Sequence, residues 1–176
     1  MKETITGTDR VYEGRVVTLD ILAVTLPDGN TSVREVVQHP GAVAVVALDS
    51  DQNVLLVRQY RIAADDMLLE IPAGTLNVGE DPQLCGDREL QEETGFRAAK
   101  FQAMGGIYAA PGYTSEYIHL FLATELTASV LPMDEDEFIE IETIPFWQAL
   151  AYIESGEIRD GKSVVGLLRA ARIFGL

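Results

Sequence analysis

Apolar residues along this chain mostly follow the spacing of β-strands. Residues 41–48, GAVAVVAL, form a continuous apolar run, which predicts a strand buried on both faces. Residues 105–113, GGIYAAPGY, are rich in glycine and predict a loop. Shorter apolar or alternating runs bounded by turn residues predict further strands at residues 54–61, 67–73, 98–104, 117–126 and 138–144.

The N-terminal part of the chain is predicted to form an antiparallel hairpin ahead of the main sheet. Residues 4–26 contain many Val, Ile, Thr and Tyr residues, which favour strands. The sequence PDGN at residues 27–30 is a turn signal, and TSVREVVQ at residues 31–38 follows as the return strand. Arg34 and Glu35 lie in that return strand, where a solvated strand face would account for both charges.

Helices are predicted from capping residues and from apolar spacing. Asp81 before Pro82 is typical of an N-cap with proline at the first helical position, and Gly95 is typical of a left-handed residue that ends a helix. Two more helices are predicted, one from Pro145 to Gly156 and one at about residues 163–174. We expect their core-facing residues to be Phe146, Trp147, Leu150, Ile153, Val164, Leu167, Leu168 and Ala171.

Length and composition predict a globular protein of the α/β or α+β class. The chain has 176 residues, of which 47% are hydrophobic, and this is enough for a sizeable core. No segment has the uninterrupted apolar length of a membrane helix, and the N-terminal sequence MKETITGTDR lacks the apolar core of a signal peptide. The one cysteine, Cys85, excludes an internal disulfide and fits the reducing cytoplasm. We therefore expect a cytoplasmic protein without a membrane partner.

The net charge of −15 argues against binding to a nucleic-acid backbone. It allows a small anionic substrate, provided that metal ions and a few arginines neutralise that substrate locally.

Three glutamates in the first predicted helix form a candidate metal site. Glu89, Glu92 and Glu93 are spaced three or four residues apart from one another or adjacent, so they can share one helix face. Arg88 can offset one of these charges but not all three. Carboxylate oxygens suit Mg²⁺ or Mn²⁺, and the glycine-containing loop before the helix would let backbone atoms approach the metal or a phosphate closely. The alternative is a solvated acidic helix face.

Other charged residues in the predicted sheet are candidates for substrate contact. Arg58 and Arg61 end a strand in a protein with few basic residues, so they are candidates to bind phosphate. Charge balance on a surface strand is the alternative for both. Glu70 is the odd polar residue in the apolar strand that precedes the helix, and it is a candidate to face the substrate.

The segment from Gly74 to Phe96 carries a family resemblance. Its 23 residues match G-x5-E-x7-R-E-U-x-E-E-x-G-U, with U apolar, at all nine specified positions. This pattern is the Nudix box, and the chain therefore resembles the Nudix hydrolases, which use divalent metal on this loop and helix to cleave nucleoside diphosphates linked to another moiety. The resemblance implies a Nudix α/β/α sandwich with a central mixed sheet at residues 41–176, preceded by an N-terminal β region at residues 1–40.

The sequence outside the box is similar to the ADP-ribose pyrophosphatase branch of that family. Pro111 lies fifteen residues after Phe96, and the segments YAAPGYTSE, LVRQYR and DEDEFIEI also resemble the branch. This implies hydrolysis of ADP-ribose to AMP and ribose 5-phosphate. It also makes Arg34 and Glu35 nucleobase or ribose contacts. The candidate substrate-binding residues are therefore Arg34, Glu35, Arg58, Arg61, Glu70, Pro111 and Glu116.

The resemblance also implies the ligands of two or three Mg²⁺ ions, with Mn²⁺ as an alternative. Glu89, Glu93 and the carbonyl of Ala73 are the principal ligands, and Glu92 is a further one. Arg88 is expected to orient the glutamates through ion pairs.

The catalytic base is implied to come from the acidic loop at residues 132–137. Glu137 fits this role best by its distance from the following strand, and Glu135 is the second choice. Together with Arg88 and Glu93, these are the candidate catalytic residues. We expect Glu80 to hold the box loop onto the helix.

The resemblance further implies a homodimer in which N-terminal strands are exchanged and the adenine pocket forms across the two-fold axis. Two alternatives remain for the function. One is the same chemistry on another nucleoside diphosphate sugar, such as ADP-glucose or GDP-mannose. The other is a Nudix domain that binds nucleotides without turnover, as a regulator.

Overall fold

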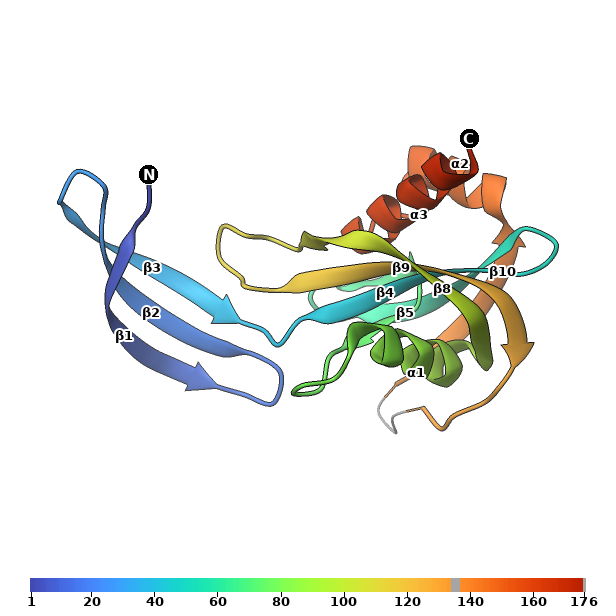
Figure 1. Cartoon of the computed structure of the whole chain (residues 1–176), viewed down its shortest axis with the longest axis horizontal. Helices are drawn as coiled ribbons and strands as arrows, with labels where there is room; N and C mark the ends of the chain where they lie inside the picture. The colour runs from blue at the N-terminus through green and yellow to red at the C-terminus, as the bar shows by residue number, and fades with distance from the viewer. Residues whose placement is uncertain (134–136, 176) are drawn as a thin grey trace. The chain divides into compact units, whose positions relative to one another are not determined.

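The structure is a computed structural model and describes residues 1–133 and 137–175. Figure 1 shows its elements along the chain. In order they are β1 (Thr4–Glu13), β2 (Thr18–Thr25), β3 (Thr31–Gln38), β4 (Ala42–Leu48), β5 (Asn53–Arg61), β6 (Asp66–Glu70), β7 (Ala73–Thr75), α1 (Pro82–Thr94), β8 (Phe96–Tyr108), β9 (Tyr117–Ala128), β10 (Ile139–Pro145), α2 (Phe146–Ser155) and α3 (Gly161–Phe174).

The contacts within the chain divide it into two units. One consists of residues 1–41 and 108–117, and the other of residues 42–107 and the chain from residue 118 onward. The loop at residues 108–117 thus belongs with the N-terminal strands, from which it is distant in sequence.

The second unit is built around β4, the strand predicted from the continuous apolar run. The order across its sheet is β10-β5-β4-β9-β8, with β6 paired to β5 and β7 paired to β4. β4 is parallel to β9, whereas β5 and β10 are antiparallel neighbours. α1 covers one face of this sheet, and α2 and α3 cover the other (Figure 1). This confirms the predicted α/β sandwich with a central mixed sheet.

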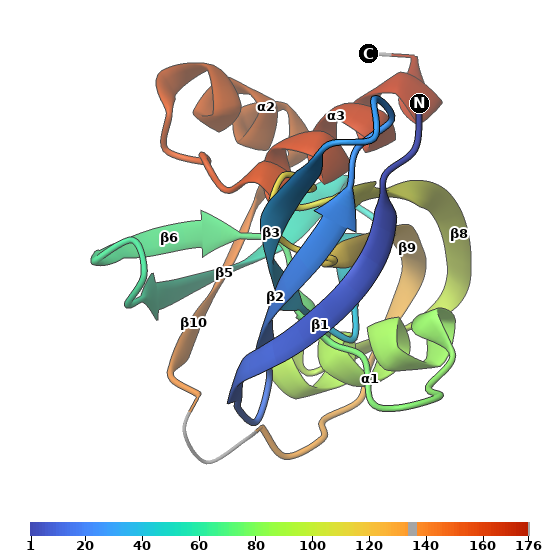
Figure 2. The same cartoon turned by 90° about the vertical axis from the view of Figure 1, so that its left-hand side faces the viewer.

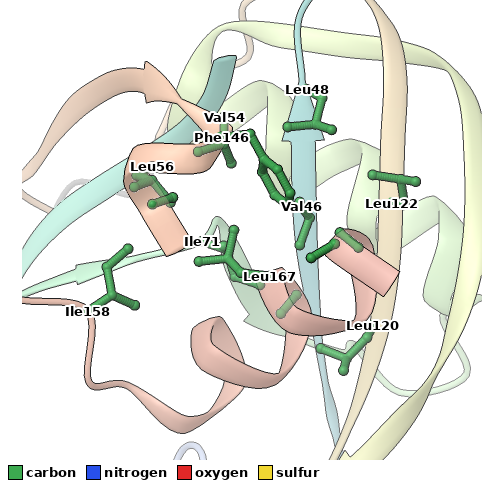
Figure 3. Packing of buried hydrophobic residues seen from close by; sticks show 14 of the residues in the cluster. Val46, Leu48, Val54, Leu56, Ile71, Leu120, Leu122, Phe146, Ile158 and Leu167 are labelled. Atoms are coloured by element: carbon green, nitrogen blue, oxygen red, sulfur yellow. The ribbon is translucent and has the colours of Figure 1, made fainter. Parts of the chain in front are cut away.

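Alternate residues of β4 enter two separate cores. Val46 and Leu48 point to the face covered by α2 and α3, where they pack with Leu167 (Figure 3). Val45 points to the opposite face and packs with Leu90 of α1. Because both faces of β4 are covered, every position of the strand is apolar, and a polar residue there would lose its contact with water.

The predicted caps of α1 are confirmed. The side chain of Asp81 accepts hydrogen bonds of 2.9 and 3.2 Å from the N–H groups of Gln83 and Leu84, and Pro82 is the first helical residue. Gly95 ends the helix with a φ of 74°, in the left-handed region where glycine is unstrained. These caps determine where α1 begins and ends.

The two C-terminal helices are confirmed, but two of their predicted core residues are wrong. Trp147 is 69% exposed and Leu168 is 50% exposed. Their neighbours Phe146 and Leu167 take the buried positions instead. A helix turns by about 100° per residue, so the residue after a buried one can lie at the edge of the buried face and be exposed, as Trp147 and Leu168 are. Among the described residues, no helix is long and apolar enough to cross a membrane.

Two strand boundaries also differ from the prediction. β8 continues to Tyr108, and Arg169 on α3 donates a hydrogen bond of 2.7 Å to the carbonyl oxygen of Met104 within this longer strand. The strand predicted at residues 67–73 is divided into β6 and β7 by Pro72, which has no N–H to contribute to a sheet. The division lets β6 pair with β5 and β7 pair with β4.

The N-terminal unit contains the antiparallel sheet β1-β2-β3, which Figure 2 shows face on. The stretch predicted as the first arm of a hairpin is therefore two strands. A turn that starts at Gly14 connects β1 to β2, and the N–H of Gly14 donates to the carbonyl of Val17 at 2.9 Å. The loop at residues 108–117 joins this unit through Val37, which donates to the carbonyl of Tyr113 at 2.8 Å and accepts from the N–H of Ser115 at 3.0 Å.

Candidate functional site

The candidate site lies where α1 packs against β7 in the second unit. Glu89 and Glu93 are one helical turn apart on α1, and they are only 8% and 3% exposed. The carboxylate of Glu93 accepts a hydrogen bond of 3.0 Å from the N–H of Ala73, the first residue of β7. The helix face that carries the two buried carboxylates is therefore fastened to the strand whose carbonyl is a predicted metal ligand.

Gly74 allows Glu89 to lie directly against the backbone of β7. A Cβ atom on Gly74 would lie 1.9 Å from Cδ of Glu89, a distance that no real contact allows. The box glycine is needed here for this close approach. The result is a carboxylate placed beside the backbone of Ala73 and Gly74.

Arg88 holds the loop and the helix together through ion pairs with three glutamates. Its Nε and Nη2 donate to the two carboxylate oxygens of Glu80 at 3.0 and 3.2 Å. Its Nη1 lies 2.7 Å from Glu89 and 2.8 Å from Glu92. Glu80 also accepts a hydrogen bond of 2.9 Å from the N–H of Asn77 in the loop. The ion pairs expected for Arg88 and the loop contact expected for Glu80 are both present.

The protonation behaviour of the glutamates follows from their surroundings. Burial raises the pKa of Glu89 to about 7, although Arg88 opposes the shift. Burial also raises the pKa of Glu93 to about 8, with the N–H of Ala73 opposing and the charge of Glu89 adding to it. Glu80 differs, because its hydrogen bonds from Arg88 lower its pKa to about 2. The two neighbouring carboxylates thus resist ionisation because they are buried, although Arg88 opposes the shift at Glu89 and Arg61 opposes it at Glu93.

The donor set of this site fits a divalent cation. Within residues 1–133 and 137–175, no group of three His, Cys, Asp or Glu side chains is positioned to hold a metal ion. The chemistry is nevertheless that of an Mg²⁺ or Mn²⁺ site, since hard carboxylate oxygens are buried next to a backbone that glycine leaves open. A bound cation would offset the charges of Glu89 and Glu93 that burial otherwise disfavours.

The two candidates for the catalytic base differ in what the structure describes. Glu137 is partly buried, and its charge contributes to the raised pKa values of Glu89 and Glu93 after the larger effect of burial. It therefore lies close enough to the two buried carboxylates to interact with them. Glu135 falls outside the described residues.

The predicted substrate residues of the second unit form two separate ion-pair groups. Arg61 donates to both oxygens of Glu70, at 3.1 and 2.7 Å, and its side chain is 39% exposed whereas that of Glu70 is 2% exposed. Arg58 instead pairs with Glu142 at 2.5 Å and with Glu157 at 2.9 Å. Arg61 thus retains an accessible cationic surface near the site, while Arg58 is engaged by two carboxylates. Glu70 faces its cationic partners in the interior.

The remaining predicted substrate residues lie in the N-terminal unit. Arg34 pairs with Glu3, with Nη2 at 2.5 Å from one oxygen and Nε at 3.1 Å from the other. Glu35 follows it in β3 and so points to the opposite face of the sheet. Pro111 is exposed and Glu116 is partly buried, and both belong to the loop at residues 108–117 that joins this unit. Their contact with substrate stays a prediction.

The sequence did not predict that Lys162 binds Glu70. Lys162 lies 2.6 Å from Glu70 and 2.9 Å from Asp160, and it comes from the first turn of α3. Lys162 and Glu70 are ninety-two positions apart in the chain. The sequence offered only a weak signal, namely a buried acidic residue at Glu70 that required a cation from elsewhere.

Replacing Gly74 with Ala is expected to weaken metal binding by about 10- to 100-fold, because the added Cβ would displace the carboxylate of Glu89. Calorimetric titration with Mn²⁺ measures this affinity. The control is Gly161→Ala, since a Cβ at that position meets nothing within 4 Å. Equal Mn²⁺ affinity in Gly74→Ala and the wild type would show that Glu89 does not need this close approach.

The raised pKa values of Glu89 and Glu93 predict how the stability of the metal-free protein depends on pH. Both groups have an ordinary pKa of 4.5, which rises to about 7 and about 8 in the folded state. Between pH 4.5 and these values the folded protein holds protons that the unfolded chain has released, so stability falls as the pH rises through this window. Glu80 has the opposite effect, but only below its ordinary pKa of 4.5.

Thermal unfolding in EDTA at a series of pH values measures this dependence. We expect Glu93→Gln to flatten the curve relative to the wild type, because it removes one of the two titrating groups. We also expect saturating Mg²⁺ to raise the melting temperature most at the alkaline end. A melting temperature in EDTA that rises steadily from pH 5 to pH 8 would contradict the assigned burial effect.

Comparison with protein families matches residues 38–164 to the family described as NUDIX domain. Several curated relatives match nearly the whole chain. The methanol dehydrogenase activator of Bacillus methanolicus is 39% identical over 168 residues, which are 94% of this chain and 91% of that protein. The ADP-ribose pyrophosphatase of Bacillus subtilis (strain 168) is 39% identical over 171 residues, 95% of this chain and 91% of that protein. The GDP-mannose pyrophosphatase of Salmonella paratyphi B is 36% identical over 180 residues, 94% of each chain.

A solved structure described as "Crystal structure of ADP compounds hydrolase" has the same fold. It superposes with a TM-score of 0.88 at 23% identity, over 99% of this chain and 95% of that one. At this identity the likeness concerns the fold.

Proposed function

The chain belongs to the Nudix family, and from this premise we propose that it hydrolyses the pyrophosphate bond of ADP-ribose, giving AMP and ribose 5-phosphate. The observation that carries the proposal is the complete Nudix box with Glu89 and Glu93 buried against the backbone of Ala73 and Gly74. A family member of almost the same length, at 39% identity, is an ADP-ribose pyrophosphatase. The chain outside the box, including Pro111, resembles the same branch.

The proposed roles follow from the positions of the side chains. Glu89, Glu93 and the carbonyl of Ala73 would hold Mg²⁺ or Mn²⁺, in two or three ions, with Glu92 as a further ligand. Bound divalent ions would neutralise phosphate oxygens and lower the pKa of the attacking water. Arg88 would hold the carboxylates of Glu89 and Glu92 in place through its ion pairs with both.

Two further residues act on the substrate and on the water in this proposal. Arg61 presents a partly exposed guanidinium that can contact the pyrophosphate. Glu137 accepts the proton of the water that attacks phosphorus, and the electrostatic interaction of Glu137 with Glu89 and Glu93 supports this role. The bond between that phosphorus and the bridging oxygen breaks, and the leaving phosphate monoester carries away the bridging oxygen.

The nearest alternative is the same reaction on a different nucleoside diphosphate sugar. It has support from a relative that is a GDP-mannose pyrophosphatase at 36% identity. Comparing kcat/KM for ADP-ribose, ADP-glucose, GDP-mannose, NADH and dinucleoside polyphosphates tests the choice. We expect ADP-ribose to give the highest value, and a higher kcat/KM for GDP-mannose would overturn the substrate assignment.

A regulator that binds nucleotides without turnover is the second alternative, and one relative is a methanol dehydrogenase activator. The complete set of box residues favours turnover, because modules of this family that only bind often lose the box glutamates.

We further propose a cytoplasmic homodimer that exchanges N-terminal strands. Every residue of β1 is exposed, and its apolar residues include Ile5 at 59% and Tyr12 at 57%. A sheet with this much exposed apolar surface is expected to pack against another chain. Sedimentation equilibrium is expected to give twice the mass of the chain. Deletion of residues 1–13 should convert the dimer to a monomer, whereas a full-length monomer would overturn the proposal.

A further inference from the structure

Glu70 is a buried carboxylate shared by two cations from different parts of the chain. Its side chain is 2% exposed at the end of β6. Arg61 of β5 donates to both of its oxygens, and Nζ of Lys162 lies 2.6 Å from Oε2. A buried carboxylate with only one of these cations would be incompletely compensated.

The same interaction continues to the start of α3. Asp160 accepts from Nζ of Lys162 at 2.9 Å and caps α3 by accepting from the N–H of Ser163 at 3.0 Å. The hydroxyl of Ser163 in turn accepts a hydrogen bond of 2.9 Å from the N–H of Ile71. Two side chains of α3 therefore fasten it to the segment that leads from Glu70 into β7. Lys162 binds the carboxylate of Glu70, and Ser163 binds the backbone N–H of Ile71.

The Arg61 end of this chain of charges is the more exposed one. Along the order Asp160, Lys162, Glu70 and Arg61, the exposed fractions of the side chains are 19%, 12%, 2% and 39%. Arg61 also interacts electrostatically with Glu93 of the candidate metal site. The network therefore places its accessible cation next to the site at which a pyrophosphate would lie.

We propose that Lys162 is a positioning residue for substrate binding, which fixes Glu70 and so holds Arg61 in the geometry needed to bind a pyrophosphate. Without Lys162 the charge of Glu70 would be opposed by Arg61 alone, so that Arg61 would be neutralised and drawn inward. With Lys162 present, Glu70 is shared between two cations, and Asp160 balances Lys162 at the other end of the network. This rests on the proposed function, because it presumes that the site binds a pyrophosphate group.

Binding of inorganic pyrophosphate tests the inference, because binding is measured without turnover. Calorimetry in the presence of Mg²⁺ is expected to show about tenfold weaker binding to Lys162→Met than to the wild type, and near wild-type binding to Lys162→Arg. In an Arg61→Gln background, Lys162→Met is expected to cause no further loss. With ADP-ribose, the same substitution should raise KM about tenfold and change kcat by less than about threefold.

Melting temperatures separate positioning from a loss of folding. Should Lys162→Met fail to fold, the double variant Glu70→Gln/Lys162→Met removes the unpaired buried charge, and we expect the same tenfold loss of affinity. Unchanged pyrophosphate affinity in a folded Lys162→Met or double variant would overturn the inference, as would an equal loss in the Arg61→Gln background. Failure of the proposed function would appear separately, as a wild-type protein that binds pyrophosphate and yields no AMP from ADP-ribose.

Discussion

Replacing Glu93 with Gln is expected to lower the turnover of ADP-ribose by about 10³-fold or more while leaving the protein folded. Glu93 is 3% exposed and accepts a hydrogen bond from the N–H of Ala73. The amide oxygen of glutamine can keep that hydrogen bond, but an amide is a poor ligand for Mg²⁺ compared with a carboxylate. The substitution also removes a buried charge that burial disfavours, so we expect the metal-free variant to be at least as stable as the wild type.

The measurement is kcat at saturating Mg²⁺ and ADP-ribose, together with thermal unfolding in EDTA. A matched control is Glu154→Gln, which changes an exposed glutamate on α2 and is expected to leave kcat unchanged. Turnover within tenfold of the wild type in a folded Glu93→Gln protein would contradict the metal site.

Replacing Glu137 with Gln is expected to lower kcat by about 10²- to 10⁴-fold and to leave the affinity for the metal largely unchanged. In the proposed mechanism Glu137 takes a proton from the attacking water and does not bind metal. Its charge acts on Glu89 and Glu93, which shows that it lies near them. Steady-state kinetics with ADP-ribose and calorimetric titration with Mn²⁺ measure the two quantities separately.

Glu135→Gln is the comparison for this experiment, because Glu135 lies in the same acidic loop. We expect it to have a much smaller effect on kcat than Glu137→Gln. If Glu135→Gln alone abolishes turnover, the base is Glu135. A large loss of metal affinity in Glu137→Gln would instead make Glu137 a metal ligand.

Much of the candidate metal site on α1 could be predicted from the sequence, because interactions between residues close in the chain determine it. The caps at Asp81 and Gly95 depend on neighbouring residues, so the start and end of α1 follow from the sequence alone. Helical spacing then predicts that Glu89 and Glu93 share a face. The ion pair of Arg88 with Glu92 is a contact within one helical turn, and it is predictable for the same reason.

Contacts between distant segments could not be predicted in this way. Lys162 reaches Glu70 because α3 packs on the sheet, and no local pattern indicates that pairing. The exposure of Trp147 likewise depends on the direction from which α2 meets the core, where Phe146 occupies the buried position. Apolar spacing along the helix predicts that Phe146 and Trp147 are both buried. The packing of α2 on the core decides which of these two adjacent aromatic residues is buried.

The central claim is metal-dependent hydrolysis of the pyrophosphate bond of ADP-ribose. Incubation of the wild-type protein with ADP-ribose and Mg²⁺ in ¹⁸O-labelled water, followed by mass spectrometry of the products, tests it most directly. We predict equal amounts of AMP and ribose 5-phosphate, one ¹⁸O atom incorporated into one of these two phosphates per turnover, and no products in EDTA. Formation of ADP and free ribose, or intact ADP-ribose after long incubation with Mg²⁺, would contradict the account.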